Sequence, residues 1–152
     1  MKIGIKGLNL IKEFEGFRED AYKCPADVWT IGYGHTNDVQ EGDVVNLSGA
    51  EILLIEDLDW AEEVVNQFVE VELNQNEFDA LVSFVFNVGS GNFQKSTLLK
   101  RLNNGGYYSV PTELKGWNKG GGKVLPGLVR RREAEGKLFI EEIQKSKQRS
   151  SK

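Results

Sequence analysis

Residues 15 to 36, EGFREDAYKCPADVWTIGYGHT, hold the side chains of this sequence that are best suited to chemistry. The segment contains Glu15, the only cysteine of the chain, Cys24, and its only histidine, His35. A carboxylic acid that is partly shielded from water keeps its proton longer and can donate it to a leaving oxygen. If the segment folds into a loop and a hairpin, Cys24 and Thr30 can reach the same end of a cleft as Glu15. The spacing is therefore compatible with a proton donor that has a thiol and a hydroxyl beside it.

Each of these residues also has an ordinary structural interpretation. A glutamate at a helix end is usually a solvated charge, and a single cysteine usually behaves as a small buried apolar residue. Thr30 suits a strand because its side chain is β-branched. His35 follows Gly34 and is typical of a hydrogen-bonded turn rather than a base. Taken one at a time, these residues do not show whether their role is catalytic or structural.

The first half of the chain predicts one helix followed by a small β-rich lobe. Apolar residues recur every three positions near the N-terminus, which indicates a helix at about 4–15 that stops at Gly16. Between residues 16 and 48, Gly, Asp, Asn and Pro interrupt short apolar pieces such as Val28 to Ile31. This alternation of short apolar pieces with turn-forming residues predicts short antiparallel strands and turns.

The second half predicts a helical lobe. Ser48 with Glu51 has the pattern of a capping box, and the periodicity behind it predicts a long helix at about 49–69 that joins the two lobes. Asn74 with Glu77 repeats the pattern before a second buried helix that closes at Gly89. Shorter helices are expected at about 96–102 and 111–114, a flexible loop at 120–122, and a final helix or helix pair at about 128–143.

These elements predict an α+β fold in a single domain that covers residues 1–152. Its small β-rich lobe covers about 16–48, and its helical lobe covers about 49–145 together with the first helix, 4–15. A cleft between lobes is where a ligand is usually bound.

Composition excludes several classes of protein. With 39% hydrophobic and 28% charged residues, the chain is typical of a globular domain. One cysteine excludes an intramolecular disulfide, and one cysteine with one histidine is too few for a usual zinc site. We therefore expect no metal and no cofactor. The amphipathic N-terminus does not have the continuous apolar stretch of a secretory signal, and no apolar run is long enough to span a membrane.

Charge is unevenly distributed along the chain. The formal net charge is −4, but residues 123–152 carry nine Lys or Arg against four Glu, a net of +5 that leaves −9 on residues 1–122. This pattern indicates either a basic helix against an acidic body or a basic face that meets a polyanion, such as a cell wall or nucleic acid.

Several segments in order resemble the phage-type lysozymes (endolysins), the family of the bacteriophage T4 enzyme and the lambdoid phage endolysins. The sequence EGFR at Glu15, followed by WTIGYGHT from Trp29 to Thr36, is similar to the signature of that family. The block NVGSGNF with the following STLL, and the closing GLVRRRE block after Trp117, fit it as well. The resemblance covers about residues 8–139 and implies a lysozyme-like version of the predicted α+β fold.

The resemblance implies a muramidase that hydrolyses the β-1,4 bond between N-acetylmuramic acid and N-acetylglucosamine in peptidoglycan, and so lyses the host cell. The catalytic pattern of the family is Glu, eight residues, Asp or Cys, five residues, Thr. Here it falls on Glu15, Cys24 and Thr30, with Cys in place of the commoner Asp. Matching motifs also imply glycan contacts at Thr36, Phe86 and Ser96.

Two reaction routes are compatible with a cysteine at the second catalytic position. Cys24 and Thr30 would hold and activate a water, which inverts the anomeric carbon, or a thiolate would attack that carbon and give a retained product. An ordinary thiol is only slightly ionised at neutral pH. Asp20 and Asp27 are alternative candidates for the second role.

The family also implies where the protein acts and with what. We expect a monomer that binds peptidoglycan strands, does not insert stably into a membrane and reaches the periplasmic wall from the host cytoplasm through a holin-type lesion. Two other functions compete with this one. A glycan-binding module without catalysis would keep the cleft. A nucleic-acid binder would use Arg130 to Arg132 and the segment from Lys145 to Lys152, and its affinity would depend steeply on salt.

Overall fold

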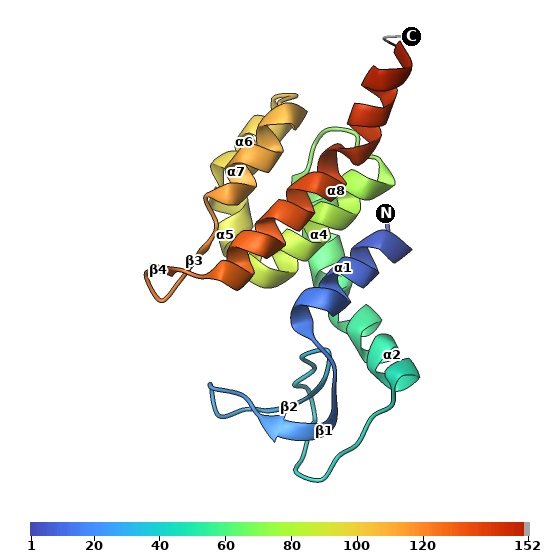
Figure 1. Ribbon diagram of the computed structural model, residues 1–152, viewed down its shortest axis with the longest axis vertical. Coiled ribbons are helices and arrows are strands. Elements are labelled where there is room, and N and C mark those ends of the chain that lie inside the picture. The colour runs from blue at the N-terminus through green and yellow to red at the C-terminus, as the bar shows by residue number, and fades with distance from the viewer. Residues whose placement is uncertain (151–152) are drawn as a thin grey trace. The chain divides into compact units, whose positions relative to one another are not determined.

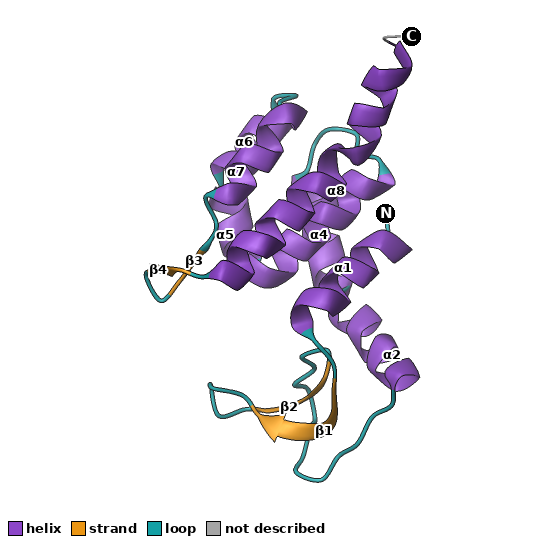
Figure 2. Cartoon of the chain, in the orientation of Figure 1, coloured by secondary structure: helices purple, strands orange, loops and turns teal. Residues whose placement is uncertain are grey.

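The protein is described from a computed structural model that covers the backbone of residues 1–150 and the side chains of residues 1–142. The basic side chains after Glu142 therefore lie outside the described residues. The chain forms two compact units, one from Ile11–Trp60 and one from Met1–Leu10 with Ala61–Lys152. The two boundaries fall inside the first helix and near the start of the third. Helices dominate and two short antiparallel hairpins complete the fold, which confirms the predicted α+β class (Figure 2).

The smaller unit, Ile11–Trp60, begins with the last turns of α1 (Ile5–Glu15). The helix stops where Gly16 takes a φ of 73°, a conformation that suits glycine. Strand β1 (Arg18–Lys23) then pairs antiparallel with β2 (Trp29–Gly32), and Tyr22 lies opposite Thr30. The helix α2 (Leu47–Asp57) completes this unit, and the predicted stop of the first helix is confirmed.

The predicted long helix at 49–69 is wrong, because the chain forms two helices there. α2 ends at Asp57 and α3 runs from Asp59 to Phe68, with Leu58 as the capping residue between them. The apolar periodicity of the sequence gives no sign of the break at Leu58, because Leu54, Leu58 and Ala61 are all buried at helical spacing. Asp59 is the first residue of α3, a position where a carboxylate is favourable, whereas Asp57 ends α2, where a carboxylate is unfavourable. Charge therefore favours the start of the second helix but does not explain the end of the first.

The predicted capping box at Ser48 is also wrong. Asn46 is the N-cap of α2, and its side-chain oxygen accepts a hydrogen bond from the backbone N–H of Gly49 at 2.7 Å. Ser48 lies inside the helix. Asparagine is as good an N-cap as serine, so two candidates two residues apart cannot be separated by sequence pattern alone. The second predicted box is confirmed at Asn74 and Glu77.

The larger unit is almost entirely helical. α4 is its buried central helix and packs along the final helix α8 (Figure 1). Gly89 closes α4 as predicted, and a short helix follows it. The predicted flexible loop at 120–122 instead belongs to a hairpin, with Gly120 in a strand and Gly121 and Gly122 in the turn. Its elements after α3 are α4 (Gln75–Val88), α5 (Ser90–Lys95), α6 (Thr97–Asn103), the 3-10 turn η1 (Tyr107–Ser109), α7 (Val110–Lys115), β3 (Lys119–Gly120), β4 (Lys123–Val124) and α8 (Pro126–Ser150).

A charged network is buried where α8 meets α4. Glu135 is fully buried and accepts a hydrogen bond from the Ser83 hydroxyl at 2.6 Å. Arg131 Nε lies 3.4 Å and Arg132 Nε 3.2 Å from its two carboxylate oxygens. Arg132 also donates to Asn87. Burial raises the pKa of Glu135, although both arginines oppose the shift.

The first ten residues are tied to the larger unit by buried carboxylates. Asp79 accepts hydrogen bonds from the backbone N–H groups of Gly4 at 2.9 Å and Gly7 at 3.0 Å. Glu62 accepts one from Ile3 at 2.6 Å. These carboxylates satisfy the free N–H groups at the start of α1 and favour its positive end. A Cβ at Gly7 would lie only 2.5 Å from the Asp79 side chain, so this position requires glycine.

None of the helices in the described part of the chain combines the length and the apolarity that a membrane crossing requires.

Candidate active site

Glu15 is the last residue of α1, and its side chain is half-buried. A Cβ at Gly34 would lie 3.8 Å from Glu15 Oε2, so the carboxylate lies against the turn that follows β2. That turn is closed by Ile31 and His35, whose backbone N–H and C=O groups exchange two hydrogen bonds of 2.9 Å. Gly34 has a φ of 83°, which glycine adopts without strain. The glycines of the WTIGYGHT segment thus form a tight turn beside the carboxylate.

Aromatic and charged side chains fix this end of α1. The Phe17 and Tyr33 rings are in contact at a centroid distance of 5.6 Å. The Lys12 ammonium lies 5.8 Å from the Tyr33 ring centroid and forms an ion pair with Glu51 of α2. The helix end that carries Glu15 is therefore held by contacts within the smaller unit.

Cys24 and Thr30 lie together across the β1–β2 hairpin. Cys24 follows β1 and its backbone N–H donates to the Val28 carbonyl at 3.0 Å, while its own carbonyl accepts from Asp27 N–H at 2.8 Å. Thr30 is buried in β2, and its hydroxyl donates to the same Val28 carbonyl at 3.0 Å. Cys24 is half-buried and reduced. The tight turn between them brings the thiol and the hydroxyl to the same end of the hairpin.

The hairpin also makes the thiol more acidic. The backbone N–H groups of Val28 and Ala26 lower the pKa of Cys24 from its ordinary value, a modest loss of hydration opposes this, and the Thr30 hydroxyl lowers it further. Hydrogen-bond donors that favour a charged form act in this direction. The Cys24 thiol therefore ionises more readily than an ordinary cysteine.

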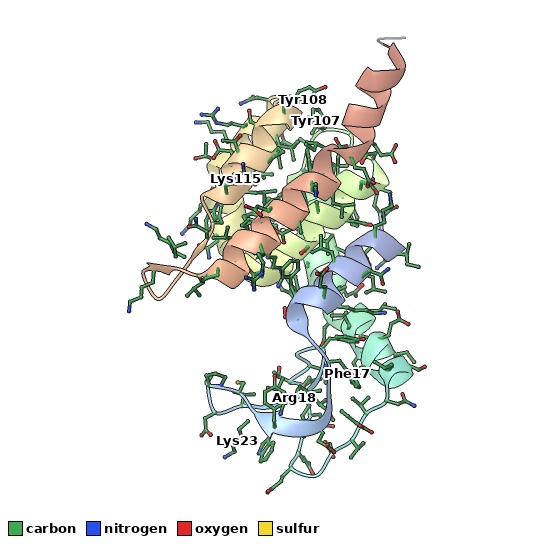
Figure 3. The ribbon with its side chains drawn as sticks, in the orientation of Figure 1. Phe17, Arg18, Lys23, Tyr107, Tyr108 and Lys115 are labelled. Atoms are coloured by element: carbon green, nitrogen blue, oxygen red, sulfur yellow. The ribbon has the colours of Figure 1, made fainter. Side chains whose placement is uncertain are left out.

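Two aspartates considered for the second catalytic role have other surroundings. Asp27 forms an ion pair with Lys23 at 3.4 Å, and its side chain is 82% exposed. Asp20 is exposed and pairs through its backbone with Val44. Lys23 also lies over the Trp29 ring at 5.5 Å, on the exposed part of the hairpin where Figure 3 labels it. Lys23 is not among the groups that make the thiol acidic.

His35 has a partner that sequence reasoning missed. Its Nδ1 lies 2.8 Å from Oδ2 of Asp57, the last residue of α2, and the imidazole is nearly buried. This contact joins the turn beside Glu15 to a helix 22 residues further along the chain. The sequence indicated a hydrogen-bonded turn at His35, but no local pattern points to Asp57.

The three predicted glycan contacts lie in different environments. Thr36 is exposed directly after the turn at His35, in the smaller unit. Phe86 is half-buried in α4 of the larger unit. Ser96 is buried at the N-cap of α6, where its hydroxyl donates to Phe93 O at 2.7 Å and accepts from Leu99 N–H at 3.1 Å. Helix capping accounts for the Ser96 hydroxyl.

Comparison with known proteins gives consistent results. The family model for phage lysozyme matches residues 12–135. An endolysin of Acyrthosiphon pisum secondary endosymbiont phage 1 is 46% identical over 91% of this chain and 98% of its own length. The Bacillus phage B103 endolysin is 47% identical over 92% of this chain, which spans only 54% of that relative. Among solved structures, the muramidase domain of SpmX from Asticaccaulis excentricus is 43% identical with a TM-score of 0.86, covering 91% of this chain and 97% of that one.

The fold and these relatives place the chain among the glycoside hydrolases. The chain belongs to the phage lysozyme family, the endolysins that cleave peptidoglycan and lyse the host cell. The lysozyme-like fold and the endolysin function expected from the sequence are thereby confirmed.

Proposed function

We propose that this protein is a lysozyme that hydrolyses the β-1,4 bond between N-acetylmuramic acid and N-acetylglucosamine, with Glu15 as the acid and Cys24 with Thr30 as the water-handling pair. The observation that carries the proposal is the paired thiol and hydroxyl at the end of the β1–β2 hairpin. The same unit holds the half-buried Glu15 carboxylate. The spacing of Glu15, Cys24 and Thr30 in the sequence and the surroundings of their side chains in the smaller unit both support these roles.

Glu15 would donate its proton to the glycosidic oxygen as the bond to the anomeric carbon breaks. The developing oxocarbenium-like centre then needs an oxygen nucleophile on its opposite face. A water held by the Thr30 hydroxyl would supply that oxygen, and the Cys24 thiolate would take the proton that the water loses. Solvent returns one proton to Glu15 and removes one from Cys24, so the enzyme is regenerated. The lowered pKa of Cys24 supports a thiolate at this position, which is the form that can take a proton from the water.

The proposed glycan contacts are Thr36 in the smaller unit and Phe86 in the larger unit. Thr36 is supported by its exposed position directly after the turn beside Glu15. Phe86 presents a half-buried aromatic ring, which suits an apolar sugar face. We do not propose a glycan contact for Ser96, because its hydroxyl already donates one hydrogen bond and accepts another in the cap of α6.

Product analysis tests the reaction class. Purified peptidoglycan should yield muropeptides that carry a new reducing N-acetylmuramic acid and the mass of one added water, measured by mass spectrometry after chromatography. Anhydro-sugar products would instead indicate a transglycosylase, and free stem peptides would indicate an amidase. Binding to peptidoglycan with no product of any kind would leave a glycan-binding module, and each of these three results contradicts the proposal.

Replacing Cys24 by Ser tests the second catalytic position. We expect the rate of wall clearing to fall about a hundredfold, since a serine hydroxyl does not ionise near neutral pH and cannot accept the proton. Cys24→Asp should retain activity because a carboxylate accepts that proton. In the wild type, activity should be lost as pH falls through the lowered thiol pKa, and this acid limb should move in Cys24→Asp.

The matched control for this prediction is Asp27→Asn, which removes a nearby exposed carboxylate and should change the rate little. If Cys24→Ser keeps most of its activity while Asp27→Asn loses it, Asp27 holds the second role. The anomer released by the wild type, followed by NMR, should be inverted. A retained anomer would favour direct attack by the thiolate.

We further propose that the protein works as a monomer, since every catalytic residue proposed here belongs to one unit of one chain. It would be made in the host cytoplasm and would meet the wall in the periplasm after a holin-type protein permeabilises the membrane. Family membership supports this order of events.

A further inference from the structure

The larger unit contains a cavity that the proposed reaction does not use. It has a volume of about 620 Å³, within the range of small-molecule sites, and it is lined by Glu72, Leu73, Asn74, Glu77, Tyr107 and Tyr108. Its residues come from the loop between α3 and α4, the start of α4, and η1. Figure 3 shows both tyrosines at the same end of this unit, with Lys115 at the other end of α7. None of the residues assigned to catalysis belongs to this unit.

The walls of the cavity are held in place by hydrogen bonds. Asn103 accepts from Glu70 N–H at 2.8 Å and donates to Phe68 O at 3.0 Å, which ties the α3–α4 loop to the end of α6. The Tyr107 hydroxyl donates to the Glu72 carbonyl at 2.6 Å and fixes the same loop from η1. The cavity is therefore largely preformed, which reduces the entropic cost of binding.

Glu77 places a buried carboxylate in the wall. The residue is only 4% exposed, and Oε1 accepts the Asn74 N–H at 2.8 Å within the capping box. Among the described residues, its other oxygen has no hydrogen-bond partner. Burial raises the pKa of Glu77 against the effect of that N–H. A cation in the cavity would compensate the charge that burial disfavours.

The rest of the lining also suits a cation. Burial and then the charges of Glu77 and Glu72 raise the pKa of the Tyr107 hydroxyl, so both carboxylates act on the same phenol. Tyr108 is 59% exposed and offers an aromatic ring. Ammonium groups bind favourably to carboxylates and to aromatic faces, and Leu73 provides an apolar contact for an alkyl chain.

We propose that this cavity is a second binding site, for the primary alkylammonium side chain of a peptide, and that its source is the free side-chain amine of an uncrosslinked peptidoglycan stem peptide. Two carboxylates, two tyrosines and one leucine match an ammonium on a flexible alkyl stem. The choice of source rests on the proposed function, whereas the amine chemistry does not. The site would hold the protein on wall segments whose amines have not been consumed in cross-links.

Binding is tested in the full chain with Glu15→Gln, so that no substrate is cut. The probe is Nα-acetyl-lysine methylamide, and its Nε-acetylated form is the uncharged control. Tyr107 and Tyr108 ring signals, followed by NMR, should shift saturably with the amine and not with the acetylated form. Adding Glu77→Gln should weaken binding by about tenfold, since a charge-assisted contact is lost while glutamine still serves the capping box. The exposed Glu63→Gln in α3 is the matched control and should bind as before.

The source is tested with a soluble stem peptide that carries a free diaminopimelate amine, against the same peptide with that amine acetylated. The free peptide should compete with the lysine probe. Equal shifts with the acetylated probe, or unchanged binding in Glu77→Gln, would overturn the site. Lysine binding without competition by the stem peptide would overturn its source. These readouts do not require cleavage, so failure of the lysozyme proposal would leave them unaffected.

Discussion

Glu15→Gln should lower the rate of wall clearing by about a thousandfold, the middle to upper part of the range for loss of a general acid. Glutamine keeps the shape of glutamate, but its amide cannot give a proton to the leaving oxygen. The rate is measured as the loss of turbidity of chloroform-treated Gram-negative cells. Because the Glu15 side chain is half-buried at a helix end, the replacement should leave the fold intact.

Glu13→Gln provides the matched control, since Glu13 is an exposed glutamate on the same helix. It removes the same charge and should retain nearly full activity. Unfolding curves of both variants should match the wild type, which separates a chemical effect from a structural one. A Glu15→Gln variant that keeps more than a tenth of the wild-type rate would show that another group protonates the leaving oxygen.

The second large effect is expected in stability, from the buried network between α4 and α8. Glu135→Gln removes the carboxylate that faces both Arg131 and Arg132, and takes an ion-pair partner from the fully buried Arg132 guanidinium. Breaking a buried ion pair in this way costs about 3–5 kcal/mol. Among the described residues, Arg132 Nη1 already has no hydrogen-bond partner, so the side chain has little alternative compensation. The free energy of unfolding in urea measures the loss.

Glu133→Gln is the control on the same helix, because Glu133 is exposed and the change should alter stability by less than about 0.5 kcal/mol. The double variant Arg132→Met with Glu135→Leu removes charge from both sides. It should recover part of the loss, as apolar replacement of buried ion pairs often does. Equal stability of Glu135→Gln and Glu133→Gln would contradict the assigned role of the network.

Local sequence patterns predicted those parts of the fold that depend on neighbouring residues. Gly16 ends α1 and the Asn74–Glu77 box begins α4, because both signals act within one helical turn. The break at Leu58 was missed because buried residues keep their helical spacing on both sides of it. Only Asp59, a favourable first residue for α3, is a local signal of the new helix.

The candidate site shows a similar division. The spacing of Glu15, Cys24 and Thr30 pointed to those residues through a family resemblance, and the hairpin places the thiol beside the hydroxyl. The pairing of His35 with Asp57 could not be predicted, because it depends on the path of the chain between them. The lowered pKa of Cys24 could not be predicted either. It is caused mainly by backbone N–H groups, and the turn rather than the residue type sets the direction in which they point.

The N-terminal segment has a consequence for biosynthesis. Its hydrogen-bond acceptors, Glu62 and Asp79, lie 59 to 75 residues further along the chain than the N–H groups they serve. At about 5–20 residues per second, a ribosome makes these partners seconds after the first residues emerge. Ile11–Trp60 is continuous and can fold first, whereas Met1–Leu10 must wait for later chain. Residues 1–10 are therefore among the last parts of this domain that can reach their native contacts.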